Sequence, residues 1–158
     1  MSADGREVIM VVRNAESSLT DLYEIDETAW LDEMARLTKS GRIDLLDLPN
    51  LSEFLSSMAK RERREVLSRL TVLLQHLLKW EFQPDRRSKS SEATIRVQRR
   101  ELQQLLESAV LRSHAVAEFE RAYTWAVEDA MSETDSAREA FPEVCPFSFE
   151  EVLSGPVP

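Results

Sequence analysis

Glycine is scarce in this chain, and its scarcity excludes several kinds of structure. Only Gly5, Gly41 and Gly155 occur among 158 residues. Hairpin turns and phosphate-binding loops need backbone positions with positive φ, which glycine adopts most easily. Leu, Glu, Arg and Ala are abundant instead, and these residues favour helices. The composition therefore predicts an all-α fold.

Cysteine and long apolar runs are also lacking. Cys145 is the lone cysteine, so no disulfide can form within the chain, and a reducing compartment is indicated. No apolar run approaches the roughly 18 residues of a membrane span. The first residues lack the basic start and the longer apolar core of a signal peptide. We therefore expect a cytoplasmic protein that makes no membrane contact.

Motifs for catalysis or cofactor binding are missing as well. The chain has no glycine-rich phosphate loop, HExxH, CxxC or nucleophile elbow. His76 has Gln75 and Lys79 as neighbours, which are poor metal ligands, and His114 has no second histidine near it in sequence. Cys145 lacks an activating base nearby, which a reactive thiol needs. We predict no enzyme activity, no cofactor and no metal site.

A strongly apolar stretch from Val66 to Phe82 is predicted to be the central helix. Its apolar residues cover an arc of about 160°, whereas a surface helix needs only about 100°. The helix must therefore be covered from more than one side, with Leu73, Leu74 and Leu77 almost fully buried. The predicted core anchors of the protein are Trp30, Leu73, Leu77, Trp80, Phe119 and Tyr123.

Further helices follow from capping residues and apolar spacing. Helices are expected at about 27–39, from Asp47 onward, from about residue 92, at about 115–133, and in a short segment after residue 148. Asp26 caps the first, Gly41 follows it, and Ser91 or Ser90 caps the helix that starts near residue 92. A capping box at 148–151 starts the last. The charged run at 60–65 either continues a helix through solvent or interrupts it.

These elements predict a mostly antiparallel bundle of about five helices around the central helix. We expect one domain at residues 21–158 and a peripheral N-terminal segment at residues 1–20. Within that segment, Val8 to Val12 are compatible with a short strand, an apolar clip on the domain, or a tail that binds another copy.

Charge is distributed unevenly along the chain. The net charge is −9, yet residues 60–100 contain twelve Lys and Arg against five Asp and Glu, a net of +7, which leaves −16 for the rest. Arginines gather in the basic hairpin, which runs from Arg86 to Arg100. They are Arg86, Arg87, Arg96, Arg99 and Arg100. They are candidates for binding the phosphates of a nucleic acid or an acidic partner.

A structural role for these arginines is the alternative. Arg86 and Arg87 are placed to bond the last carbonyls of the central helix, and Arg99 to lay its methylenes on the core. A pI near 4.8 is low for a nucleic-acid-binding module. We favour the structural interpretation for most of them.

Trp125 suggests a different contact, because it lies nearly opposite the apolar stripe of its own helix. Val72 likewise points away from the main arc of the central helix. Water-soluble monomers seldom leave large apolar patches uncovered. We expect the C-terminal segment or a second copy to cover this surface, and we predict a homodimer. The candidate interaction residues are Arg86, Arg87, Arg96, Arg100 and Trp125.

Several segments resemble a known family. They are LYEID at 22–26, SGRIDLLDLPNLSEFL at 40–55, RERREVLSRLTVLLQHLLKWEFQPDRRS at 61–88, ATIRVQRREL at 93–102 and AFPEVCPFSFEEVL at 140–153. On these the chain resembles the bacterial family called domain of unknown function 29. The resemblance implies a small bacterial helical bundle and implies no reaction.

As function we therefore expect a protein-interaction or scaffold module that self-associates, with an unknown protein partner. The alternative is a nucleic-acid-associated regulator that uses the basic hairpin, Arg86 to Arg100. An enzyme of unknown type is the third possibility, since no acid–base or metal constellation can be assembled from the sequence.

Overall fold

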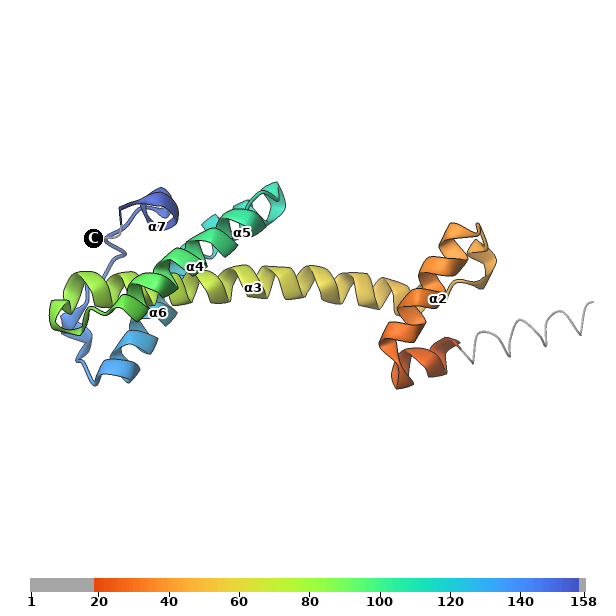
Figure 1. The fold of residues 1–158 in the computed structure, drawn as a ribbon, viewed down its shortest axis with the longest axis horizontal. Helices are drawn as coiled ribbons and strands as arrows, with labels where there is room; N and C mark the ends of the chain where they lie inside the picture. The colour runs from red at the N-terminus through yellow and green to blue at the C-terminus, as the bar shows by residue number, and fades with distance from the viewer. Residues whose placement is uncertain (1–18, 157–158) are drawn as a thin grey trace, which may run out of the picture. The chain divides into compact units, whose positions relative to one another are not determined.

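The computed structural model describes residues 19–156, apart from the side chain of Arg86. Within this range the structure is helical and contains no strand, which confirms the predicted all-α class (Figure 1). Residues 19–25 are helical. The later helices are α2 (Glu27–Lys39), α3 (Leu48–Phe82), α4 (Lys89–Leu105), α5 (Ala109–Ala117), α6 (Phe119–Thr134) and α7 (Phe149–Ser154). Single 3₁₀ turns occur at Ile43–Leu45, Pro84–Arg86 and Arg138–Ala140.

Contacts within the chain divide it into two units, Met1–Ala59 and Lys60–Pro158, and α3 contributes residues to both. The predicted domain limits, 1–20 and 21–158, stay predictions, because this division describes contacts and not independent folding. The predicted strand, clip or tail at Val8 to Val12 lies outside the described residues.

The first unit has a small core around α2. Trp30, Met34 and Leu37 are buried on one face of the helix, and the rings of Tyr23 and Phe54 pack against Trp30. The bounds predicted for α2 are confirmed, since the side chain of Asp26 accepts a hydrogen bond from the backbone of Ala29. The local caps thus fix the helix that positions Trp30.

Glycine is required at one position after α2. Gly41 has a φ of +72°, a conformation that strains residues with a Cβ. Its amide donates to the carbonyl of Thr38 and helps to close the helix end. The sequence predicted this glycine from its place just after the helix.

Helix α3 is continuous over 35 residues, so the charged run at 60–65 continues the helix and does not interrupt it. Asp47 precedes its first residue and accepts hydrogen bonds from the backbone and side-chain amides of Asn50 and from the indole of Trp30. Most side chains of the charged run are exposed, and Glu65 pairs with Arg69 one turn later at 2.9 Å. The run therefore has little apolar surface to bury.

The second unit is built around the C-terminal part of α3. The core face of this part of the helix is lined by Val66, Leu67, Leu70, Leu73, Leu74, Leu77 and Leu78, all buried. Residues from α4, α5, α6 and the C-terminal segment complete the same apolar cluster. Figure 1 shows α4 and α6 packed along this part of α3. Among the predicted anchors, Leu73, Leu77 and Tyr123 are buried, while Trp80 and Phe119 are partly buried.

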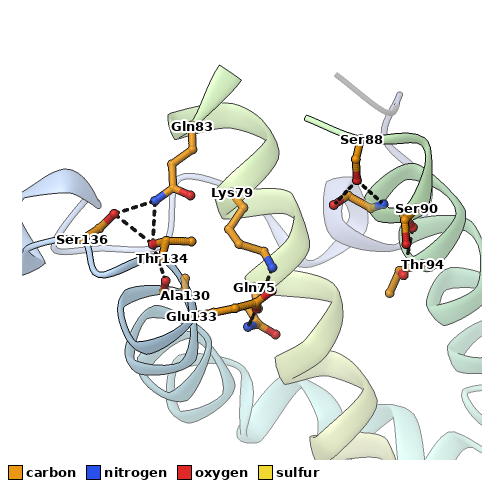
Figure 2. Close-up of polar contacts among 11 residues, drawn as sticks. Gln75, Lys79, Gln83, Ser88, Ser90, Thr94, Ala130, Glu133, Thr134 and Ser136 are labelled. Carbon is orange, nitrogen blue, oxygen red and sulfur yellow. Dashed lines mark hydrogen bonds and ion pairs between the residues drawn. The ribbon is translucent and has the colours of Figure 1, made fainter. Parts of the chain in front are cut away.

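Two predicted boundaries are wrong. Helix α4 begins at Lys89 with Ser88 as its cap, rather than after Ser91 or Ser90; the hydroxyl of Ser88 accepts from the backbone of Ser91 (Figure 2). The helix predicted at 115–133 is two helices, because the chain kinks at Glu118, between α5 and α6. Val116, in α5 just before the kink, is 55% exposed.

The C-terminal segment ends in α7, whose predicted capping box at Ser148 and Glu151 is confirmed. Val152 and Leu153 are buried against the core of the second unit. Phe149 meets Phe119 edge to face at 5.7 Å between ring centroids. Arg112 adds an ion pair to Glu150 at 2.6 Å. The segment is therefore held to α5 and α6 as well as to α4.

None of the helices in residues 19–156 combines the length and the apolar character that crossing a membrane requires.

Candidate interaction site

Four arginines of the basic hairpin, Arg87, Arg96, Arg99 and Arg100, make contacts within the chain, each with a different partner. Arg87 Nε donates to the carbonyl of Trp80 at 2.7 Å, and its guanidinium lies over the Trp80 ring. This contact closes the end of α3 in the way the structural interpretation predicted. Arg96 pairs with Glu92 at 2.7 Å and Arg100 with Glu101 at 3.2 Å. These contacts support the structural interpretation for three of the candidates.

Arg99 contacts the C-terminal helix α7, unlike the neighbouring arginines. Its Nε donates to the carbonyl of Val152 at 2.9 Å, and an Nη donates to the carbonyl of Glu151 at 3.3 Å. Gln103 Nε2 reaches the carbonyl of Leu153 at 3.2 Å. These carbonyls lie in the last turn of α7, where backbone donors become scarce, although the carbonyl of Glu151 also accepts from the amide of Gly155 at 2.8 Å. Side chains of α4 therefore cap a helix about 50 residues away in sequence.

A polar cluster joins the C-terminal ends of α3 and α6. Figure 2 shows Gln75 and Lys79 converging on Glu133, with distances of 2.6 and 2.7 Å to its Oε2. One helical turn beyond Lys79, Gln83 Nε2 donates to the hydroxyls of Thr134 and Ser136 at 3.0 and 2.9 Å. The C-terminal ends of the two helices therefore lie together.

The positive charge of Lys79 in this cluster is paired with the negative charge of Glu133. The ammonium of Lys79 is almost buried, which is costly without a partner. The hydrogen bond from Lys79 lowers the pKa of the Glu133 carboxyl, with its positive charge contributing. The pKa of His76, on the same helix, is lowered chiefly by burial and further by the charge of Lys79. Its Nδ1 is buried and makes no hydrogen bond within the described chain. Partial burial and the charge of Lys79 thus disfavour the protonated form of His76.

Cys145 is half-buried beside the core, and its Sγ lies 3.4 Å from the carbonyl of Phe147. Burial raises the pKa of the thiol above its ordinary value. A raised pKa disfavours the reactive thiolate. The thiol accordingly has the properties of a structural cysteine.

A groove of about 770 Å³ lies between α3, α5 and α6, wholly within the second unit. Its apolar surface comes from Leu67 and Val72 of α3 and from Trp125 of α6, whose ring is 37% exposed. Among the described residues that line the groove, none belongs to the C-terminal segment. The structure thus brings together Trp125 and Val72, the two apolar residues that the sequence placed off the stripes of their own helices.

Charged residues of both signs line the groove. Arg64 comes from α3, Arg121, Glu128 and Asp129 come from α6, and Glu118 lies between α5 and α6. Arg121 pairs with Glu118 at 3.1 Å, and its guanidinium stacks over Trp125 at 4.5 Å. In the described part of the chain, Arg64, Glu128 and Asp129 form no ion pair. The groove therefore combines an apolar surface with charges of both signs.

Ser68, His114 and Asp129 line the same groove, but their side chains are not arranged as a catalytic site. A nucleophile, its base and the residue that orients the base are normally joined by hydrogen bonds. No hydrogen bond links any two of these three side chains within residues 19–156. The same range contains no group of three His, Cys, Asp or Glu side chains placed to hold a metal ion.

The sequence identified Trp125 as a candidate but missed the charged residues that flank it. Arg64 belongs to a run of six charged residues and carries no signal that separates it from its neighbours. Glu128 and Asp129 are exposed acids on an acidic chain. The only sequence signal that could have identified them is their spacing of one helical turn from Trp125. That spacing points to the groove only when the position of α3 next to α6 is known.

The fold and the groove define the class of protein: its described residues form an all-helical structure with an amphipathic groove in the second unit. The chain belongs to the family described as domain of unknown function DUF29, which matches residues 22–156. The match spans nearly the whole chain and confirms the resemblance seen in the sequence. No curated protein and no solved structure matches the chain.

Proposed function

We propose that this protein is a protein-interaction module that binds a second copy of itself. The observation that carries the proposal is the groove, in which the exposed ring of Trp125 lies with Val72 and Leu67. Tryptophan is enriched at the energetically important centres of protein interfaces. Charged residues around such a centre are typical of the polar rim. The groove therefore has the composition of an interface.

Binding rather than catalysis is the activity that these side chains support. The hydroxyl of Thr71 is used within its helix, donating to the carbonyl of Leu67 at 2.9 Å. The remaining polar groups of the groove are mostly charged and positioned for pairing. A single, half-buried thiol fits a reducing compartment such as the cytoplasm, which is the location we propose.

Sedimentation equilibrium of the full chain at micromolar concentration tests the proposal. We expect the mass of two chains, with dissociation on dilution. A monomeric mass across the concentration range contradicts self-association. Because the proposed interface includes charges, the dimer should weaken as salt is raised.

A further inference from the structure

The last helix, α7, lies in a seat formed by side chains of three earlier helices. At the start of α7, Arg112 of α5 pairs with Glu150 at 2.6 Å, and its guanidinium carbon lies 5.7 Å from the centre of the Phe149 ring. The ring of Phe119, the first residue of α6, meets the same ring at 5.7 Å. At the end of α7, side chains of α4 donate to the carbonyls of residues 151–153. The seat thus holds α7 along its whole length.

This seat selects the direction and the pattern of the helix that it holds. The last carbonyls of a helix are short of backbone donors, so the donors on Arg99 and Gln103 bind that end of a helix. A carboxylate in the first turn meets Arg112, as that of Glu150 does. Apolar residues at the first, fourth and fifth positions of α7 pack against the core. The seat therefore fits a short amphipathic helix with an acidic first turn.

The surroundings of α7 allow the C-terminal strap, defined as residues 143–156, to leave the seat as a unit. Figure 1 shows α7 at the edge of the second unit. Just before the strap, the carbonyl of Pro142 accepts hydrogen bonds from Tyr123 at 2.7 Å and from Arg138 at 3.1 Å, which anchor the chain. Val144 follows with an exposure of 71% and provides a hinge. A pocket of about 150 Å³ between the end of the strap and the core shows that packing there is incomplete.

The attachment of α7 is small compared with the core of the second unit. Its buried residues are Val152 and Leu153. The side chain of Glu150 is 69% exposed, so water screens its ion pair. Units with few buried apolar contacts open locally at free energies below that of global unfolding. Opening leaves the donors on Arg99 and Gln103 without their carbonyl acceptors and exposes apolar surface beside them, which a replacement helix can cover.

We propose that the strap opens as a unit and that the uncovered seat binds a short amphipathic helix of a partner protein. That helix has an acidic residue in its first turn and apolar residues at its first, fourth and fifth positions, as α7 has. In the closed state α7 occupies the seat, so the strap competes with the partner and regulates its binding. The seat residues Arg99, Gln103 and Arg112 do not line the groove at Trp125. The inference therefore goes beyond the proposed self-association.

Native-state hydrogen exchange tests whether the strap opens as a unit. The amides of Val152 and Gly155, which donate to the carbonyls of Ser148 and Glu151, report on opening. We expect them to exchange at least about a hundredfold faster than the amides of residues 70–78 in α3, with a smaller dependence on urea. Exchange of both sets at one rate and with one urea dependence overturns the proposal, because the strap would then open only when the whole unit unfolds.

A peptide with the sequence of residues 146–156, labelled with a fluorophore at its N-terminus, is the probe for the seat. Its binding to the full chain is followed by fluorescence anisotropy. Val152→Ser in the full chain weakens the strap and leaves the seat intact, so this variant should bind the probe about tenfold more tightly than the native chain does. Val144→Ser, at the exposed hinge position, is the control and should leave the affinity unchanged. A probe in which Val152 and Leu153 are both serine should bind at least about tenfold more weakly.

A seat variant locates the bound probe. Arg99→Ala removes donors that both the strap and the probe use, so its effect is measured in the Val152→Ser chain, in which the strap is already weakened. There it should weaken binding of the probe about thirtyfold, as expected for two lost hydrogen bonds. Circular dichroism verifies that each variant is folded. If Val152→Ser does not fold, Glu150→Gln replaces it, since this change removes an exposed ion pair and should tighten binding about threefold.

Each outcome has a distinct meaning. Tighter binding in the strap variant, lost again on Arg99→Ala, supports the proposal. A probe that binds neither the native chain nor the strap variant overturns it. Binding that Arg99→Ala leaves unchanged places the probe elsewhere and also overturns it. A full chain that is monomeric in sedimentation equilibrium contradicts the proposed self-association and leaves this inference standing.

Discussion

Replacing Leu74 by alanine should strongly destabilise the second unit. Leu74 is fully buried in the C-terminal part of α3, within the cluster to which α4, α5, α6 and the C-terminal segment all contribute. The change removes three carbon atoms, and at about 0.8 kcal/mol for each buried methylene the lost transfer free energy alone is about 2.4 kcal/mol. A cavity adds to this cost wherever neighbours cannot close in. We expect a total loss of about 2–5 kcal/mol.

Urea denaturation followed by circular dichroism measures this loss. With a denaturant slope of about 1–3 kcal/mol per molar, a loss of about 3 kcal/mol lowers the midpoint by about 1–3 M. Protein concentration must be held constant, because self-association adds to the measured stability. Val116→Ala is the control, since Val116 is 55% exposed on α5 and its truncation should change the free energy of unfolding by no more than about 0.5 kcal/mol.

A loss below about 1 kcal/mol for Leu74→Ala would refute the assignment of α3 as the central element. An equal loss for Leu74→Ala and Val116→Ala would refute the burial pattern on which the fold is argued.

Two further changes test the polar contacts. Arg99→Ala removes two hydrogen bonds that cap α7, of about 1 kcal/mol each, so amide hydrogen exchange in residues 148–156 should accelerate about thirtyfold. Arg100→Ala, at an exposed ion pair, should leave exchange there unchanged. His76 has a folded-state pKa below 6.5, so the unfolded chain binds a proton at this residue more readily than the folded chain does. The contribution of His76 to stability is therefore complete above about pH 6.5. It is lost as pH falls through the folded-state pKa. The free energy of unfolding of His76→Gln should depend less on pH below 6.5 than that of the native chain. An unchanged pH dependence contradicts the lowered pKa of the partly buried His76.

Local signals predicted much of the fold. The bounds of α2 and the start of α7 follow from side-chain caps that act within three residues, and Asp26 and Ser148 are both read directly from the sequence. The breadth of the apolar arc predicted the central part of α3. These features depend on neighbours in sequence, which is why they could be predicted.

Other features depend on packing and carry no local signal. The kink at Glu118 involves neither glycine nor proline, and the chain there departs from helix only slightly, with φ −96° and ψ 5°. Ser88, Ser90 and Ser91 are equally good caps by type, and the tertiary position of the turn selects Ser88. The groove depends on the rotation of α6 about its axis relative to α3. Trp125 could be singled out from sequence, but its neighbours could not.

The capping of α7 by α4 has a consequence for the order of folding. A helix of six residues is too short to be stable alone, because its few hydrogen bonds do not offset the unfavourable free energy of helix nucleation. Its last carbonyls find their donors on Arg99 and Gln103. Those donors are in place only once α4 has formed and lies on the core. We therefore expect α7 to become helical and to dock in a single step, late in folding, after the loop of about 50 residues between it and α4 has closed.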